Sequence, residues 1–189
     1  MSAPKDAAPL ATPEAPWLGL RSFTEFAHGY FFGRGAELED LFERIVDKPL
    51  TVLFGRSGLG KSSLLQASLT PRLRERGFLP VLVRFDHAPE AAGLGEQMLR
   101  KLLEALRSEG WGTLADRLAE GIREAEARPE WNAADFLWLI FHDPFYGLLP
   151  GRTEAAKPFP RPVFLIDQFE EIFTLGDRQV RRPVSIRCV

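Results

Sequence analysis

The chain has 189 residues, of which 45% are apolar and 26% charged, values typical of one soluble globular domain. Its single cysteine, Cys188, excludes intrachain disulfides and cysteine-ligated zinc or iron–sulfur sites, and its three histidines lack the spacing of metal ligands. The net charge of −2 excludes a global basic field that would draw nucleic acid onto the chain, so we expect a cytoplasmic protein that does not bind nucleic acid through this segment.

The N-terminal part divides into a lead and an aromatic segment. Residues 1–16 are rich in alanine and proline, which predicts a disordered lead. The segment 17–32 has five aromatic side chains up to Phe31 and is too apolar for a linker, so we expect it to pack on the domain. The longest uninterrupted apolar run, Phe136–Phe141, is too short to span a membrane, so no membrane partner is expected.

The next segment contains a helix, a strand and a second helix. Apolar residues at helical spacing predict a helix over Ala36–Val46, which Pro49 ends. The run Leu50–Phe54 predicts a short buried strand. A glycine-rich turn follows, and Lys61–Leu69 is expected to form a helix that Pro71 limits or kinks.

The second half of the chain alternates strands and helices. This order predicts an α/β fold with a parallel sheet covered on both faces. The expected elements are a strand over Leu79–Phe85, helices over Glu96–Arg107, Thr113–Ala127 and Asn132–Phe141, a proline-rich loop over Pro144–Pro162, and a strand over Val163–Ile166.

The glycine-rich turn carries the strongest motif. The sequence GRSGLGKS fits the phosphate-loop pattern, in which glycines let successive N–H groups point at phosphate oxygens and a helix N-terminus faces the same way. Lys61 is expected to reach the β- and γ-phosphates and Ser62 to bind Mg²⁺ through its hydroxyl. The pattern requires no role for Ser63. The expected nucleotide-binding residues here are Gly55, Arg56, Ser57, Gly58, Leu59, Gly60, Lys61, Ser62 and Ser63.

A cluster of acids follows the last predicted strand. Asp167 ends it, and ligands of parallel sheets lie beyond the carboxyl ends of the strands, so Asp167 is expected to hold the hydration shell of Mg²⁺. Glu170 or Glu171 is expected to polarise the attacking water as a general base, with Glu170 preferred, although the sequence does not separate the two. The alternative is an acid pair at a helix start, which the helix dipole favours.

Four segments together resemble the novel STAND NTPases, which are signal-transduction ATPases related to AAA+ proteins and mostly bacterial. The acidic segment is the most specific of them, whereas many families share the phosphate loop. The likeness extends from about residue 16 to residue 175. The segments that carry it are PWLGLRSF at 16–23, FFGR at 31–34, the phosphate loop at 55–62 and DQFEE at 167–171.

The resemblance implies a P-loop NTPase three-layer sandwich that binds ATP and Mg²⁺. It implies a switch in which ATP holds one conformation and slow hydrolysis resets it. It also places the adenine near Gly33, Arg34 and Glu37. The family often has an acid directly after the arginine, where this chain has Gly35.

The C-terminal end departs from the family pattern, since family members continue into more sheet, a sensor residue, a helical lid and a C-terminal region. We therefore expect an incomplete NTPase domain over 17–178, followed by an atypical basic tail over 179–189. The tail lacks helical periodicity and resembles a truncated or frame-shifted end, and a disordered basic end is the alternative. Protein partners or self-association are expected through downstream regions.

Other functions compete with this reading. A P-loop GTPase reads guanine through Asn-Lys-x-Asp, but the only asparagine, Asn132, is followed by Ala133. A small-molecule kinase has no need of the acids at 167, 170 and 171. An AAA+ DNA-binding ATPase of the origin-recognition type would need a basic DNA-binding module, and this sequence contains no such module. A nucleotide-binding interaction module without turnover stays open, because a lid and an arginine finger are missing.

Overall fold

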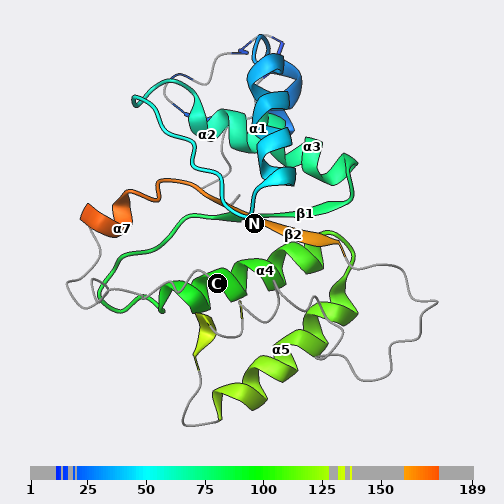
Figure 1. Ribbon diagram of the computed structural model, residues 1–189, viewed down its shortest axis with the longest axis vertical. Coiled ribbons are helices and arrows are strands. Elements are labelled where there is room, and N and C mark those ends of the chain that lie inside the picture. The colour runs from blue at the N-terminus through cyan, green and yellow to red at the C-terminus, as the bar shows by residue number, and fades with distance from the viewer. Residues whose placement is uncertain are drawn as a thin grey trace, which may run out of the picture. The chain divides into compact units, whose positions relative to one another are not determined.

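The computed structural model describes residues 12, 13, 15, 16, 19, 21–127, 132–134, 137 and 160–174, and all structural statements concern these residues. The chain forms two compact units, Met1–Phe78 and Leu79–Val189, which are described separately (Figure 1). The expected tail 179–189 lies outside the described residues, as do most of the lead 1–16, of the helix 132–141 and of the loop 144–162.

The described part of the first unit is built from helices. A 3₁₀ helix, η1, spans Glu25–Tyr30, and α1 spans Gly35–Asp47. The helix predicted over Ala36–Val46 is thereby confirmed, with Leu41 and Phe42 buried on its apolar face. The aromatic segment before it packs only in part, because Phe23 contacts Phe31 at a ring distance of 5.8 Å while Phe26 and Phe32 are exposed.

A continuous helical segment follows the glycine-rich turn. It consists of α2 (Lys61–Ser63), the π-helical η2 (Leu64–Leu69) and α3 (Thr70–Glu75). The N–H of Thr70 donates to the carbonyl of Leu65 five residues earlier, and its hydroxyl donates to the same carbonyl at 2.9 Å. Pro71 falls in the first turn of α3, where a missing N–H is tolerated. Of the two predicted effects of Pro71, the end of the helix is wrong, because the chain stays helical to Glu75 after the π-helical turn. The kink stays a prediction.

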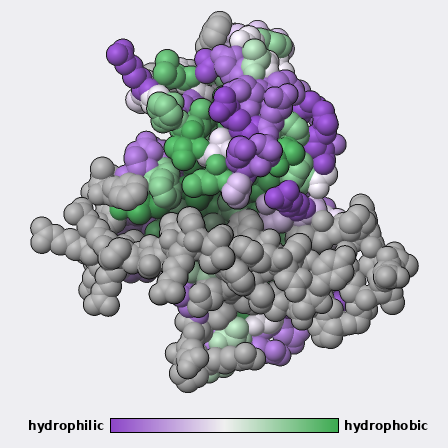
Figure 2. Space-filling view, in the orientation of Figure 1, coloured by the Kyte–Doolittle hydropathy of each residue, from purple (hydrophilic) through white to green (hydrophobic). Residues whose placement is uncertain are grey.

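The strand predicted over Leu50–Phe54 is wrong. The segment has no regular structure, and Leu50 and Phe54 expose 78% and 88% of their surface. A strand needs a neighbour to pair with its N–H and carbonyl groups, and the described part of the first unit contains no strand before Phe78. Figure 1 draws this segment in cyan between α1 and α2. In the same orientation, Figure 2 shows hydrophobic surface open to solvent at that place.

The second unit contains a parallel pair of strands. β1 spans Phe78–Val83, its first residue closing the first unit, and β2 spans Arg161–Ile166. The strands are neighbours, and the N–H that follows β2 donates to the last carbonyl of β1, so both run in the same direction (Figure 1). Both strand predictions in this half are confirmed. Along the sequence, the two strands are separated by α4 (Leu94–Ser108) and α5 (Gly112–Glu126), and α7 (Glu171–Thr174) follows β2.

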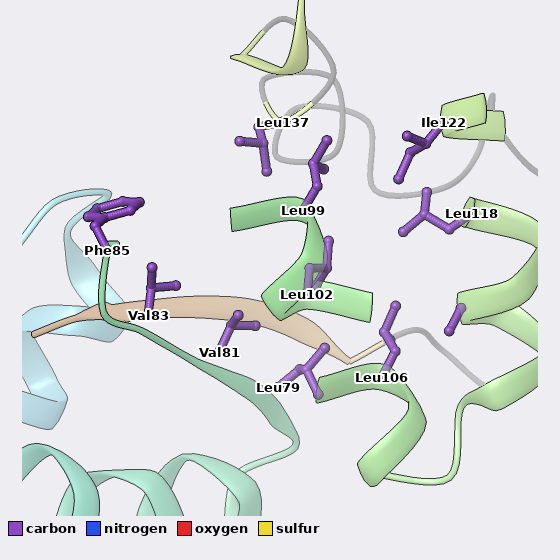
Figure 3. Close-up of a cluster of buried hydrophobic side chains, with 11 residues drawn as sticks. Leu79, Val81, Val83, Phe85, Leu99, Leu102, Leu106, Leu118, Ile122 and Leu137 are labelled. Carbon is purple, nitrogen blue, oxygen red and sulfur yellow. The ribbon is translucent and has the colours of Figure 1, made fainter. Parts of the chain in front are cut away.

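The core of the second unit joins β1 to α4. Leu79, Val81 and Val83 alternate along β1 and therefore share one face, which points at α4 (Figure 3). From α4, apolar side chains three, four and seven residues apart meet this face, as expected for one side of a helix. The α4 and α5 residues of this core are Leu99, Leu102, Leu106, Ala115, Leu118 and Ile122. The alternation of strands and helices agrees with the α/β class, and the three-layer sandwich stays an expectation.

Leu102→Ala tests this core. Leu102 is fully buried between β1 and α5, so we expect the substitution to lower the free energy of unfolding by about 2–5 kcal/mol. Leu82→Ala is the matched control, since Leu82 lies on the opposite face of β1 and is 39% exposed. Urea unfolding followed by circular dichroism measures both. An equal loss in the two variants would contradict the assignment of the core.

Candidate functional site

The phosphate loop keeps the conformation that its glycines allow. Residues 55–60 form an irregular turn that leads into α2 at Lys61. Gly58 and Gly60 have φ angles of +83° and +76°, in the left-handed region that glycine adopts without steric cost. A side chain at Gly55 would place its Cβ only 3.3 Å from the side chain of Leu59. The loop therefore closes on itself, with its first residue against its fifth.

Lys61 lies across this loop. Its Nζ donates to the carbonyl of Gly55 at 2.9 Å and to that of Arg56 at 3.2 Å. The ammonium group thus sits over the first two residues of the loop, where it partially neutralises two carbonyl dipoles. A cation held on carbonyl oxygens is a donor that an anionic ligand can take over, because a charged acceptor makes the stronger hydrogen bond.

Ser63 joins the phosphate loop to the chain before η1. Its hydroxyl is buried and accepts the N–H of Phe23 at 3.0 Å. Nearby, the ion pair of Glu25 with Arg74 joins the first residue of η1 to α3. The sequence pattern requires no role for Ser63, and the structure gives it this one.

Arg34 reaches the phosphate loop from the start of α1. Gly33, with a φ of +82°, turns the chain into Arg34, which caps the helix. One guanidinium nitrogen of Arg34, Nη2, donates to the carbonyl of Leu59 at 3.3 Å, and its Nε lies 3.3 Å from a carboxylate oxygen of Glu37. The structure therefore brings together two sets of residues that the sequence singled out separately.

A groove of about 840 Å³ lies between α1 and the segment before the phosphate loop. Its walls combine charged side chains of α1 with apolar side chains of residues 50–54. Arg34 and Glu37, which the resemblance places near the adenine, are among its lining residues. The others that matter for a flat aromatic ligand are Leu41, Thr51, Leu53 and Leu64.

Two arginines of the first unit form ion pairs on the surface of the protein. The hydrogen bond from Arg44 lowers the pKa of Asp40, and the same bond raises the pKa of Arg44. The hydrogen bond to Glu39 raises the pKa of Arg72. These pairs are exposed and contribute little to stability. Asp40 and Arg44 line the groove, so its α1 wall carries fixed charges of both signs.

The acidic segment begins where the two strands end. The backbone N–H of Asp167 donates to the carbonyl of Val83 at 2.9 Å, which places Asp167 at the carboxyl end of the sheet. Gln168 has a φ of +58°, the only positive φ outside glycine among the described residues. Its carbonyl accepts the N–H of Glu171 at 2.9 Å, so the chain turns sharply and starts α7.

The two glutamates of this segment have different surroundings. Glu170 is exposed, whereas the side chain of Glu171 is 24% exposed and lies 3.9 Å from a guanidinium nitrogen of Arg84. The sequence reasoning missed Arg84. The only signal was a charged residue near the end of the run Leu79–Phe85, and nothing local ties it to an acid far along the chain.

The loop after β1 is also fixed at the carboxyl end of the sheet. The side chain of Gln97 accepts the N–H of Asp86 at 2.8 Å and donates to its carbonyl at 2.9 Å. Gln97 also donates to the carbonyl of Ala92 at 2.7 Å. One side chain of α4 thus holds the loop at both ends.

The candidate residues fall into two groups. The phosphate loop, Gly33, Arg34 and Ser63 belong to the first unit, and Asp167, Glu170 and Glu171 belong to the second. Within the described part of the chain, no three His, Cys, Asp or Glu side chains gather to hold a metal, and no helix is long and apolar enough to cross a membrane. The hydroxyl of Ser62 and the carboxylate of Asp167 are the hard oxygen donors that suit Mg²⁺, which is commonly held by one or two carboxylates and the phosphates of a ligand.

Comparison with known proteins gives one match. The family model described as Novel STAND NTPase 1 matches residues 16–188, which is nearly the whole chain. Searches with the chain match neither a curated protein nor a solved structure.

Proposed function

The chain belongs to the Novel STAND NTPase 1 family, and we propose that it binds ATP with Mg²⁺ and uses slow hydrolysis as the reset of a signalling switch. The observation that carries this proposal is the closed phosphate loop with the Lys61 ammonium across it. A loop of glycine-rich backbone before a helix N-terminus, with a lysine cation over it, is suited to a chain of phosphates.

Binding exchanges one set of hydrogen bonds for a stronger set. Lys61 gives up the carbonyls of Gly55 and Arg56 for the β- and γ-phosphate oxygens, and the charged acceptors make shorter, stronger bonds. The backbone N–H groups of the loop bind the remaining phosphate oxygens. The loop needs little rearrangement for this, because the glycines already hold their left-handed angles.

Ser62 and Asp167 are the residues that we propose to hold Mg²⁺. Bound with ATP, Mg²⁺ would supply positive charge that neutralises the phosphates. Ser62 would contribute its hydroxyl, and Asp167 would order the water around the ion. The two residues belong to different units, so their roles are tested one at a time. The Mg²⁺ dependence of ATP binding is measured in Ser62→Ala and, separately, in Asp167→Asn.

Glu170 is our proposed acid for positioning the attacking water. Arg84 lies beside the Glu171 carboxylate and draws it toward the end of β1. Glu170 lies at the exposed end of the same turn. A general base must reach its proton directly or through one water, and exposure leaves Glu170 accessible to one.

Preference for adenine is tested by thermal unfolding. A ligand that binds only the folded protein raises the melting temperature, and at equal concentration the ligand with the higher affinity raises it more. If the groove beside Arg34 and Glu37 takes adenine, Mg-ATP will raise the melting temperature more than equimolar Mg-GTP. Differential scanning fluorimetry with both nucleotides makes the measurement. Equal protection would remove the adenine assignment and leave phosphate binding alone.

A further inference from the structure

The bond from Arg34 falls on one particular peptide unit. Its acceptor is the carbonyl of Leu59, which belongs to the peptide that joins Leu59 to Gly60 inside the phosphate loop. A trans peptide is planar, and its carbonyl and N–H point in opposite directions. The described residues contain no cis peptide bond. Holding the Leu59 carbonyl toward Arg34 therefore directs the N–H of Gly60 away from Arg34.

The peptides on both sides of Leu59–Gly60 have backbone bonds, because the N–H of Leu59 donates to the carbonyl of Arg56 at 3.5 Å and the carbonyl of Gly60 accepts the N–H of Leu64 at 2.8 Å. The side chains of the two residues restrain the peptide between them only weakly. Gly60 has a φ of +76° and no side chain, and glycine adopts both signs of φ with nearly equal ease. The side chain of Leu59 is 52% exposed, so packing restrains it weakly. The bond from Arg34 to the Leu59 carbonyl therefore adds a restraint from outside the loop to the peptide that carries the Gly60 N–H.

We propose that Arg34 is a positioning residue for phosphate binding, which holds the Leu59–Gly60 peptide so that the Gly60 N–H is directed to bind a phosphate oxygen. This role rests on the proposed function, and it differs from contact with the base. The guanidinium suits the task because its planar fork can bond Leu59 through Nη2 while Nε lies against Glu37. The Glu37 carboxylate lies beside Nε, away from the Nη2 atom that bonds the loop.

Inorganic tripolyphosphate separates the two roles of Arg34, because it has phosphates and no base. We expect Arg34→Ala to weaken binding of Mg-ATP, Mg-GTP and Mg-tripolyphosphate by the same factor, about tenfold, as for the loss of one charge-assisted hydrogen bond. Isothermal titration calorimetry measures all three. A loss for Mg-ATP with unchanged tripolyphosphate affinity would overturn the proposal in favour of a base contact.

Two further variants separate geometry from charge. Arg107→Ala removes an arginine charge from α4 of the second unit without touching the loop or the groove, since Arg107 pairs with Asp116. We expect it to leave tripolyphosphate affinity unchanged, and a loss equal to that of Arg34→Ala would overturn the proposal. Arg34→Lys keeps the charge and loses the fork, so it should weaken all three ligands severalfold. If circular dichroism shows that Arg34→Ala does not fold, Arg34→Lys replaces it as the test variant. Affinity equal to that of the unaltered protein in Arg34→Lys would then overturn the proposal.

The outcomes also distinguish this inference from the proposed function. If the unaltered protein binds neither Mg-ATP nor Mg-tripolyphosphate, the phosphate-loop assignment fails and the role of Arg34 fails with it. If the unaltered protein binds both and Arg34→Ala binds tripolyphosphate equally well, only the role of Arg34 fails.

Discussion

Lys61→Ala is expected to reduce Mg-ATP affinity by about a hundredfold or more, which removes measurable binding. Its ammonium makes two bonds to loop carbonyls and is proposed to transfer both to phosphate oxygens. Each charge-assisted bond contributes about 1.5–3 kcal/mol, and every 1.4 kcal/mol is a tenfold change in affinity. Isothermal titration calorimetry of the variant with Mg-ATP makes the measurement.

Lys101→Ala is the matched control for Lys61→Ala. It removes a lysine charge from α4 of the second unit, where Lys101 pairs with Glu104 on the surface. Mg-ATP affinity should not change in this control. The melting temperature of Lys61→Ala without nucleotide should stay close to that of the unaltered protein, because the bonds of Lys61 are exposed. Unchanged affinity in a folded Lys61→Ala protein would remove the phosphate loop from the site.

Glu170→Gln is expected to preserve Mg-ATP binding and to lower turnover by about 10²–10⁴-fold. The amide keeps the size of the carboxylate but does not accept a proton, so only the chemical step suffers. Phosphate release at saturating Mg-ATP measures turnover. Calorimetry in parallel shows whether binding is kept.

Glu171→Gln is the matched comparison. We expect it to keep most of the turnover, and to lower stability by less than about 1 kcal/mol through its pair with the exposed Arg84. If only Glu171→Gln loses turnover, the choice of Glu170 is wrong and Arg84 becomes a neighbour of the catalytic acid.

Local pattern was sufficient for most elements. The helices α1, α4 and α5 follow from apolar residues at helical spacing, and β1 and β2 from short runs of strand-forming residues. Pattern failed at Leu50–Phe54, because a strand depends on a partner that its own residues do not encode. It also failed after Pro71, where a π-helical turn absorbs a break that proline usually causes.

The candidate site divides in the same way. The phosphate loop and the acidic segment are contiguous, so residue types and spacing were enough to find them. The bond of Arg34 to Leu59 joins residues 25 positions apart, and that of Phe23 to Ser63 joins residues 40 apart. No local pattern encodes such pairs. The pair of Arg84 with Glu171 spans a longer interval still, and for this reason the sequence left the two glutamates unresolved.

Titration of the unaltered protein with Mg-ATP tests the central claim most directly. We expect one saturable site per chain by isothermal titration calorimetry, with affinity that falls when EDTA removes Mg²⁺, because the ion neutralises the phosphates that Lys61 binds. Absence of saturable binding at millimolar Mg-ATP would contradict the assignment of this chain as an ATP-binding NTPase.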